Sequence, residues 1–196
     1  MAIKPKELQP KLSEEMLKVI NKSHGENTDV GIQYDDVERY KYRIMKMLTE
    51  DEDLISTLNN KALDGHKGDD YRFVNIFNFL KIPDTQSTVK NFVCFEVNDV
   101  EQPRYSEGLM KKYIIFRTVS HEDDIQTDYG VARQDLLALI IKNKFDWSQE
   151  FGMHIEKIQD YGKIAENGYY YREFVYETTT ANNLVNKAKA ILNINR

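Results

Sequence analysis

The spacing of hydrophobic residues alternates between helical and strand-like stretches, and the order of these stretches predicts the fold. The sharpest helical pattern starts at Asp35 and Asp36, which favour the positive end of a helix dipole. Apolar residues then recur three or four positions apart and form one stripe. The residues of this stripe are Val37, Tyr40, Ile44, Met47 and Leu48. A second short helix is predicted to carry Leu54, Ile55 and Leu58.

Strand-like patterns fill the middle of the chain. The runs 71–82, 91–97 and 112–120 are rich in Phe, Val, Ile and Tyr, as is typical of strands. Alternation in the third run places Ile114 and Phe116 on one face and Arg117 and Val119 on the other. The polar stretches 59–70 and 98–110 contain glycine or proline and are predicted to be exposed loops.

A strongly apolar helix is predicted over 128–143, directly after an acidic loop at 121–124. Its predicted buried body is Leu136, Leu137, Leu139, Ile140 and Ile141, closed by Phe145 and Trp147. Two further strands, 154–161 and 169–178, are joined by a loop whose Asn167-Gly168 pair is a strong turn signal. A last helix is predicted over 182–193.

This order predicts a single α+β domain over residues 35–196. We expect a mixed, mostly antiparallel central sheet with helices packed on one side. Residues 1–34 form an N-terminal arm with one short predicted helix, capped by Ser13. So short a helix is marginal alone, and we expect the arm to be disordered in the free subunit. Met16, Leu17 and Ile20 share one side of it and are candidate contacts to a neighbouring subunit.

Charge and composition argue against several classes of protein. The formal net charge is −5, which argues against a dedicated nucleic-acid binder, because such proteins usually have a basic face. The chain has no apolar run long enough to span a membrane and no apolar stretch typical of a secretory signal. The single Cys94 cannot form an internal disulfide, and its apolar neighbours predict a buried, inert thiol.

Residues with metal-binding chemistry gather in one place. His121, Glu122, Asp123 and Asp124 are consecutive, but they lie on a loop without the glycine-centred pattern of a calcium site. A solvated turn is therefore favoured over a divalent-ion site, and we predict no metal and no cofactor. Glu122, Asp123 and Asp124 are instead candidate contacts to a subunit or partner.

An enzyme of the nuclease class is the alternative. Pro83-Asp84 followed by Glu96-Val97-Asn98 is similar to the arrangement in restriction-type nucleases, but Asn98 stands where these enzymes have a lysine. Neither a nucleophile elbow nor a phosphate-binding glycine loop occurs. The tyrosines of the 169–172 cluster could stack on bases, but alternation along a strand favours core or interface positions. We therefore expect a binding or structural protein and not an enzyme.

Several segments together resemble a family of neck proteins from tailed bacteriophages, described as tail-terminator, tail-completion or head–tail connection proteins. They include Tyr40-Lys-Tyr-Arg-Ile-Met45 and Gly162-Lys-Ile-Ala-Glu-Asn-Gly-Tyr-Tyr-Tyr-Arg172. The others are 52–54, 81–86, 89–92, 121–125, 129–130 and 133–138. The resemblance covers most of the chain beyond the arm.

This resemblance implies a small α+β subunit of a homo-oligomeric ring, commonly a hexamer. Such a ring ends the tail tube at its head-proximal end and joins it to the head connector. The implied partners are copies of the chain and other neck and tail-tube proteins, in a virion assembled in the host cytoplasm. DNA would pass through the lumen without sequence-specific binding, which suits an acidic chain because it does not grip phosphate. An adaptor or stopper role in the neck is the alternative within this class.

Overall fold

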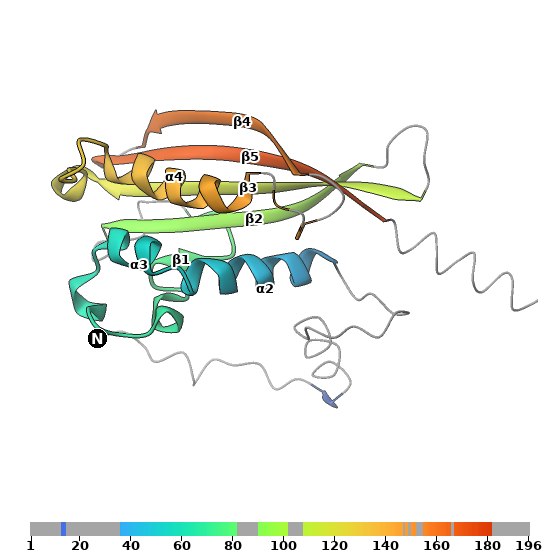
Figure 1. The fold of residues 1–196 in the computed structure, drawn as a ribbon, viewed down its shortest axis with the longest axis horizontal. Helices are drawn as coiled ribbons and strands as arrows, with labels where there is room; N and C mark the ends of the chain where they lie inside the picture. Colours follow the sequence, from blue (N-terminus) through green and yellow to red (C-terminus); the bar gives the residue numbers. More distant parts are fainter. Residues whose placement is uncertain are drawn as a thin grey trace, which may run out of the picture.

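The computed structural model describes residues 13–14, 36–81, 90–101, 108–146, 148, 150–151, 155–165 and 167–181. Its centre is a five-stranded sheet in the order β1-β2-β3-β5-β4 (Figure 1). The strands are β1 (Ile76–Phe77), β2 (Asn91–Glu101), β3 (Leu109–His121), β4 (Ile155–Ile164) and β5 (Tyr169–Ala181). β1 runs parallel to β2 and every other pair is antiparallel, which confirms the mixed, mostly antiparallel α+β prediction.

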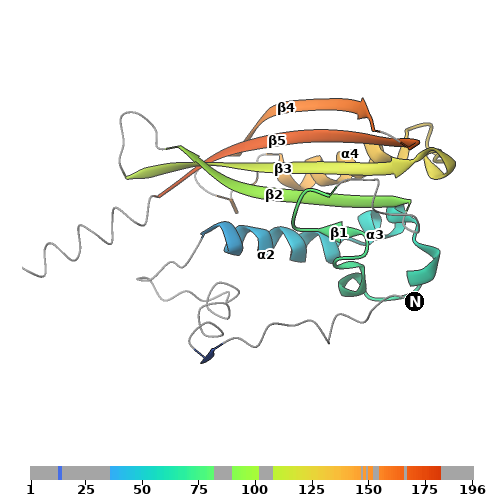
Figure 2. The ribbon, with the colours of Figure 1, turned by 180° about the vertical axis from the view of Figure 1, so that it is seen from behind.

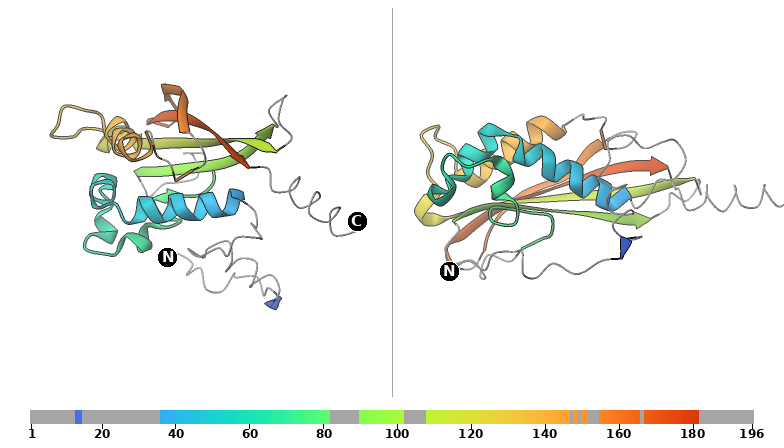
Figure 3. Two further views of the ribbon diagram at one scale, coloured as in Figure 1. Left: turned by 45° about the vertical axis from the view of Figure 1, so that its right-hand side comes forward. Right: turned by 90° about the horizontal axis from the view of Figure 1, so that it is seen from below.

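The α-helices of the described core lie on one side of this sheet. They are α2 (Asp36–Thr49), α3 (Glu52–Leu58) and α4 (Arg133–Phe145). α4 crosses β3 and β5, and α2 runs along β2 (Figures 1 and 3). α3 starts where the carboxylate of Asp51 accepts a hydrogen bond from the backbone N–H of Leu54 at 3.0 Å, as an N-cap does.

Aromatic rings fill the core between helices and sheet. Phe116 stacks on Phe174 with ring centroids 5.3 Å apart and meets Phe145 edge-on at 4.8 Å. Tyr40, Ile44 and Leu48 of α2 are buried as predicted. A smaller cluster on the other face contains Phe77, Phe92, Cys94, Val119 and Tyr169. Burial there raises the pKa of the Cys94 thiol to about 11, so that it stays a thiol at neutral pH.

The predicted buried face of α4 is partly wrong. Leu137 and Ile141 are fully buried, but Leu139 is 57% exposed, and Leu136 and Ile140 are only half-buried. A helix turns by about 100° per residue, so consecutive apolar residues cannot all face one sheet. The side that packs on the sheet is the set Gln134, Leu137, Ala138, Ile141 and Phe145.

Two other boundaries differ from prediction. Within 71–81 only Ile76–Phe77 is a strand, because Tyr71 ends a 3-10 helix and Phe73 takes a left-handed conformation, with φ of 57°. The predicted loop 98–110 is shorter, since β2 and β3 extend into it and their residues Asp99 and Lys112 form an ion pair. The helices predicted at 13–21 and 182–193, and Trp147, fall outside the described residues apart from 13–14.

Turn residues behave as predicted between β4 and β5. Asn167 and Gly168 have φ of 59° and 74°, as a tight hairpin turn with two left-handed residues requires.

Ion pairs tie α4 to the two last strands. Arg172 of β5 contacts Asp135 of α4 at 3.0 Å and Asp160 of β4 at 2.6 Å. Lys142 of α4 lies 2.9 Å from Asp160. Burial alone would raise the pKa of Asp160, but Arg172 and Lys142 outweigh it and hold this pKa below its usual range.

The exposed and buried leucines of α4 make a matched test of the core. Leu137→Ala should lower the free energy of unfolding by about 2–5 kcal/mol, because it leaves a cavity beside Phe116 and its neighbours. Leu139→Ala, two residues away and exposed, should change it by less than about 0.5 kcal/mol. Urea unfolding followed by circular dichroism measures both. Equal losses would contradict the packing described above.

The lowered pKa of Asp160 predicts a specific acid sensitivity. A carboxylate whose pKa is lower in the folded state stabilises the fold above its unfolded pKa, and this stabilisation is lost as the pH falls through the folded pKa. Asp160→Asn removes that contribution. The melting temperature of the variant should therefore fall below that of the parent at pH 7 and approach it as the pH drops below about 4. Parallel melting curves at all pH values would refute this.

Candidate partner interface around the acidic turn

The three acidic residues that follow β3 form a 3-10 helix, η5 (Glu122–Asp124). The turn begins where the ring nitrogen Nδ1 of His121 accepts a hydrogen bond from the N–H of Asp123 at 3.2 Å. Glu122 and Asp123 are exposed, whereas Asp124 is half-buried. The turn therefore presents two carboxylates to solvent and directs the third inward.

Asp124 is held by three side chains from different elements. Asn59 donates from Nδ2 to both carboxylate oxygens, at 3.0 and 2.9 Å. Asn91 donates to Oδ2 at 2.6 Å, and Arg133 lies 3.1 Å from Oδ1. These donors come from the end of α3, the start of β2 and the start of α4. Asp124 thus closes the junction of three elements.

Arg133 extends the junction through all three nitrogens of its guanidinium group. It donates to the backbone carbonyls of Asp124, Thr57 and Gln126 at 2.6, 2.9 and 3.2 Å. Thr57 belongs to the last turn of α3, where carbonyls lack partners within the helix. One guanidinium therefore donates hydrogen bonds both to the end of α3 and to the loop that leads into α4.

Buried asparagines continue the network below the turn. Asn91 donates to the carbonyl of Leu58 at 3.2 Å and accepts at its own carbonyl from Asn75 at 2.7 Å. Asn60 donates to the side-chain oxygen of Asn75 at 2.7 Å. The side-chain oxygen of Asn91 itself is buried and has no hydrogen-bond partner in the described part of the chain.

These groups line a polar hollow of about 450 Å³. Lys61, Lys90 and Asp123 stand at its exposed side, and Lys90 lies 3.1 Å from Asp123. A hydrogen bond and the charge of Lys90 hold the pKa of Asp123 below its usual range. The hollow therefore offers amide groups within and both signs of charge at the rim.

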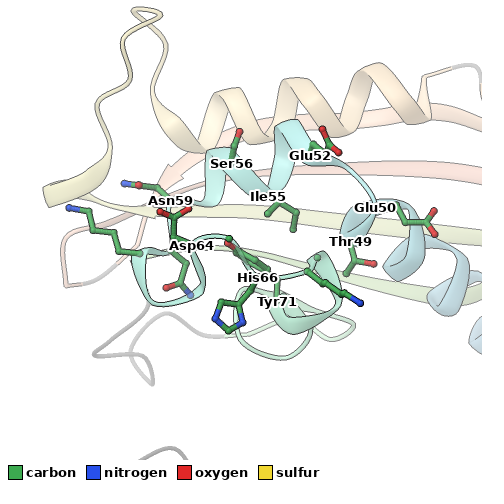
Figure 4. A pocket seen from close by; sticks show the side chains of 14 residues that line it. Thr49, Glu50, Glu52, Ile55, Ser56, Asn59, Asp64, His66 and Tyr71 are labelled. Carbon is green, nitrogen blue, oxygen red and sulfur yellow. The ribbon is translucent and has the colours of Figure 1, made fainter.

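A wider groove of about 870 Å³ adjoins this hollow and shares Asn59, Asn60 and Lys61 with it. Its walls come from α3 on one side and from the segment 59–71 on the other (Figure 4). Glu50, Glu52, Asp64 and His66 line it, and His66 lies 3.4 Å from Asp70. The hollow and the groove together make this end of the domain a broad polar surface.

Gly68 is needed beside this groove because the chain passes very close to the end of α2. A Cβ atom added at Gly68 would lie 1.7 Å from the backbone oxygen of Thr49. No side chain can be accommodated against a backbone atom at that distance, so glycine is required for close approach and not for a turn.

The residues that we predicted as partner contacts differ in their accessibility. Glu122 is exposed and its N–H bonds to the carbonyl of Gly168 at 2.8 Å, so the β4–β5 turn lies against it. Asp123 is also accessible, but the carboxylate of Asp124 is already occupied by internal donors. The partner role of Glu122 and Asp123 stays a prediction, and Met16, Leu17 and Ile20 lie outside the described residues.

Sequence reasoning missed the donors around Asp124. Asn59 has φ of 48°, and asparagine in this left-handed position just after a helix is a recognisable C-cap signal. No local sequence signal marks Arg133 as a partner of Asp124, and we placed it only in a predicted apolar helix. Its contacts span 76 residues of sequence, and only the folded chain brings them together.

The other chemical candidates are involved in packing. Glu96, considered for a nuclease, forms an ion pair with Lys41 of α2, while Asp84 falls outside the described residues. Tyr169 packs edge-on against Phe92, and the guanidinium of Arg117 lies 4.8 Å from the ring centre of Tyr171. Over the described residues, no three His, Cys, Asp or Glu side chains are grouped to hold a metal, and no helix is long and apolar enough to cross a membrane.

Comparison with known proteins gives a match to a protein family. A family model described as YomW matches residues 41–178, which is 138 of the 196 residues. The matched segment starts in α2 and ends in β5, so it spans the helices, the sheet and the acidic turn. No curated protein matches the chain.

Replacing Asp123 and Asp124 separately tests whether the fold depends on Asp124 and not on Asp123. Asp124→Ala should lower the free energy of unfolding by about 2–4 kcal/mol, because it leaves the charge of Arg133 without its carboxylate and removes one acceptor from the buried amide of Asn91. Asp123→Ala removes only an exposed ion pair and should leave stability unchanged within error. Chemical denaturation of both variants measures the difference. A stable Asp124→Ala variant would show that the junction does not depend on this carboxylate.

Proposed function

We propose that this chain, which belongs to the phage-derived YomW family, is a structural protein of the virion neck. In this proposal copies of the chain form a ring, commonly a hexamer, at the head-proximal end of the tail tube. The ring ends tube growth and joins the tube to the head connector. Its partners are further copies and other neck and tail-tube proteins.

The observation that carries this proposal is an agreement between the fold and the resemblance to tail-terminator proteins. That resemblance implies a central sheet with helices on one side, and this is the architecture of the domain. The resembling segments 40–45, 133–138 and 162–172 lie in α2, α4 and the β4–β5 hairpin, which build or flank the core. The match to a phage-derived family covers the same elements.

The surface chemistry is compatible with a subunit that contacts several neighbours. The polar hollow and groove expose both carboxylates and lysines at one end of the domain. Glu122 and Asp123 are accessible there for a partner with complementary charge. Such rim charges mainly direct association and specificity, and they weaken with salt. The negative net charge also suits a lumen through which DNA slides.

Deleting the chain from the phage that encodes it tests the role in the neck. We expect filled heads and separate tails, with tail tubes of irregular length, in electron micrographs of the lysate. The wild-type chain supplied in trans should restore joined particles. Normal particles without the chain would overturn the proposal. Separate heads with tubes of uniform length would assign the adaptor or stopper role instead.

Purified chain provides the second arm of this test. Incubation with linear DNA and Mg²⁺ should leave the DNA intact on a gel. Metal-dependent cleavage that Glu96→Gln abolishes would favour the nuclease class and contradict a purely structural role. Asp123→Asn serves as the control for a carboxylate outside that motif.

A further inference from the structure

β4 is the outermost strand of the sheet. Its inner edge pairs with β5 from Ile155 to Ile164, and no described element lies beyond its outer edge (Figures 1 and 2). A strand of ten residues with a free edge presents unpaired peptide groups, which is a template for another strand. Ile158 and Ile164 on it are 47% and 75% exposed.

The sequence of β4 complements itself when it is read in the opposite direction. In an antiparallel pair of two copies, Glu156 can face Lys163, Gln159 can face Tyr161, and Ile155 can face Ile164, while Ile158 sits in the bulge. Opposite charges and apolar pairs across strands each stabilise a sheet. Every pair occurs twice because a two-fold axis relates the copies, as an isologous contact requires.

The faces of the sheet agree with this pairing. Ile155 lies opposite Thr178 and Ile164 opposite Tyr170, two positions of β5 that share a face. Glu156 and Lys163 lie opposite Glu177 and Tyr171, which share the other face.

The bulge between Lys157 and Gln159 is what makes the faces agree. It shifts the alternation of β4 by one residue. On a regular strand, Glu156 and Lys163 would point to opposite faces, and so would Ile155 and Ile164. Bulges and lysines usually keep an edge from pairing, but here the bulge aligns the strand with its own reversed copy.

Two charges of this edge have no ion-pair partner among the residues that the structure describes. Neither Glu156 nor Lys163 forms an ion pair with any described residue, and Lys163 only lies 4.7 Å from the ring centre of Tyr161. The remaining charged residues of β4, Lys157 and Asp160, do form ion pairs. Glu156 and Lys163 are also the two charged residues that face each other in the antiparallel arrangement.

We propose that β4 pairs with β4 of a second copy of this chain, antiparallel about a two-fold axis, and joins two five-stranded sheets into one of ten strands. The partner is specified by the strand itself, because Glu156 matches Lys163 and Ile155 matches Ile164 in reversed order. Such a contact closes on two copies, so a neck ring would need another, head-to-tail contact elsewhere on the surface. The pairing goes beyond the proposed function and does not depend on it.

A charge swap within one strand tests the pairing. Sedimentation velocity of the purified full chain between about 1 and 100 μM should show dimers, with larger even-numbered assemblies if a second contact also forms. Glu156→Lys and Lys163→Glu, each alone, place like charges opposite each other twice and should weaken dimerisation by about tenfold or more. The double variant restores both pairs and should recover the parent dissociation constant.

Controls separate this contact from effects on folding. Both residues are exposed, so all variants should keep the parent melting temperature. Lys61→Glu, at the rim of the distant hollow, should leave the dimer unchanged. A chain that is monomeric at 100 μM, or a dimer that responds to neither single swap, would overturn the proposal. So would a double variant no better than the single ones. None of these results bears on the particle assay, which tests the neck role independently.

Discussion

The domain depends on the inward-facing carboxylate of Asp124. It accepts hydrogen bonds from Asn59 and Asn91 and forms an ion pair with Arg133. These contacts lie where α3 ends and where β2 and α4 begin. A half-buried carboxylate is stable there because each of its oxygens has charged or amide donors. The same contacts set the direction in which α4 leaves β3, and so bring Leu137 and Phe145 onto the aromatic core around Phe116.

This constraint also decides which groups are left for partners. Asp124 is occupied by the junction, whereas Glu122 and Asp123 on the same turn face solvent beside Lys90 and Lys61. The exposed polar surface is therefore a by-product of the contact that secures the fold. A surface with both signs of charge suits the repeated subunit contacts that we propose.

The sheet has two unlike edges, and this bears on how subunits assemble. The β1 edge is short, and the neighbouring part of β2 is tied to α2 through Glu96 and Lys41. The β4 edge is long and no described strand pairs with its outer side, and a bulge aligns its sequence with a reversed copy. One open edge favours pairing of two copies, whereas a closed ring of more copies has to use different surfaces on each side of the subunit.

The sequence by itself determined the element order, the α+β class, the stripe of α2 and the turn at Asn167 and Gly168, because these follow from local periodicity and local backbone preference. It also indicated that Cys94 is buried. It did not determine which side of α4 faces the sheet, since Leu136 to Ile141 are all apolar and only packing on the core selects Leu137 over Leu139. Nor did it separate Asp124 from Asp123, or bring Asn59, Asn91 and Arg133 together. Asn59 and Asn91 lie 65 and 33 positions from Asp124 along the chain, and no local pattern encodes contacts over such separations.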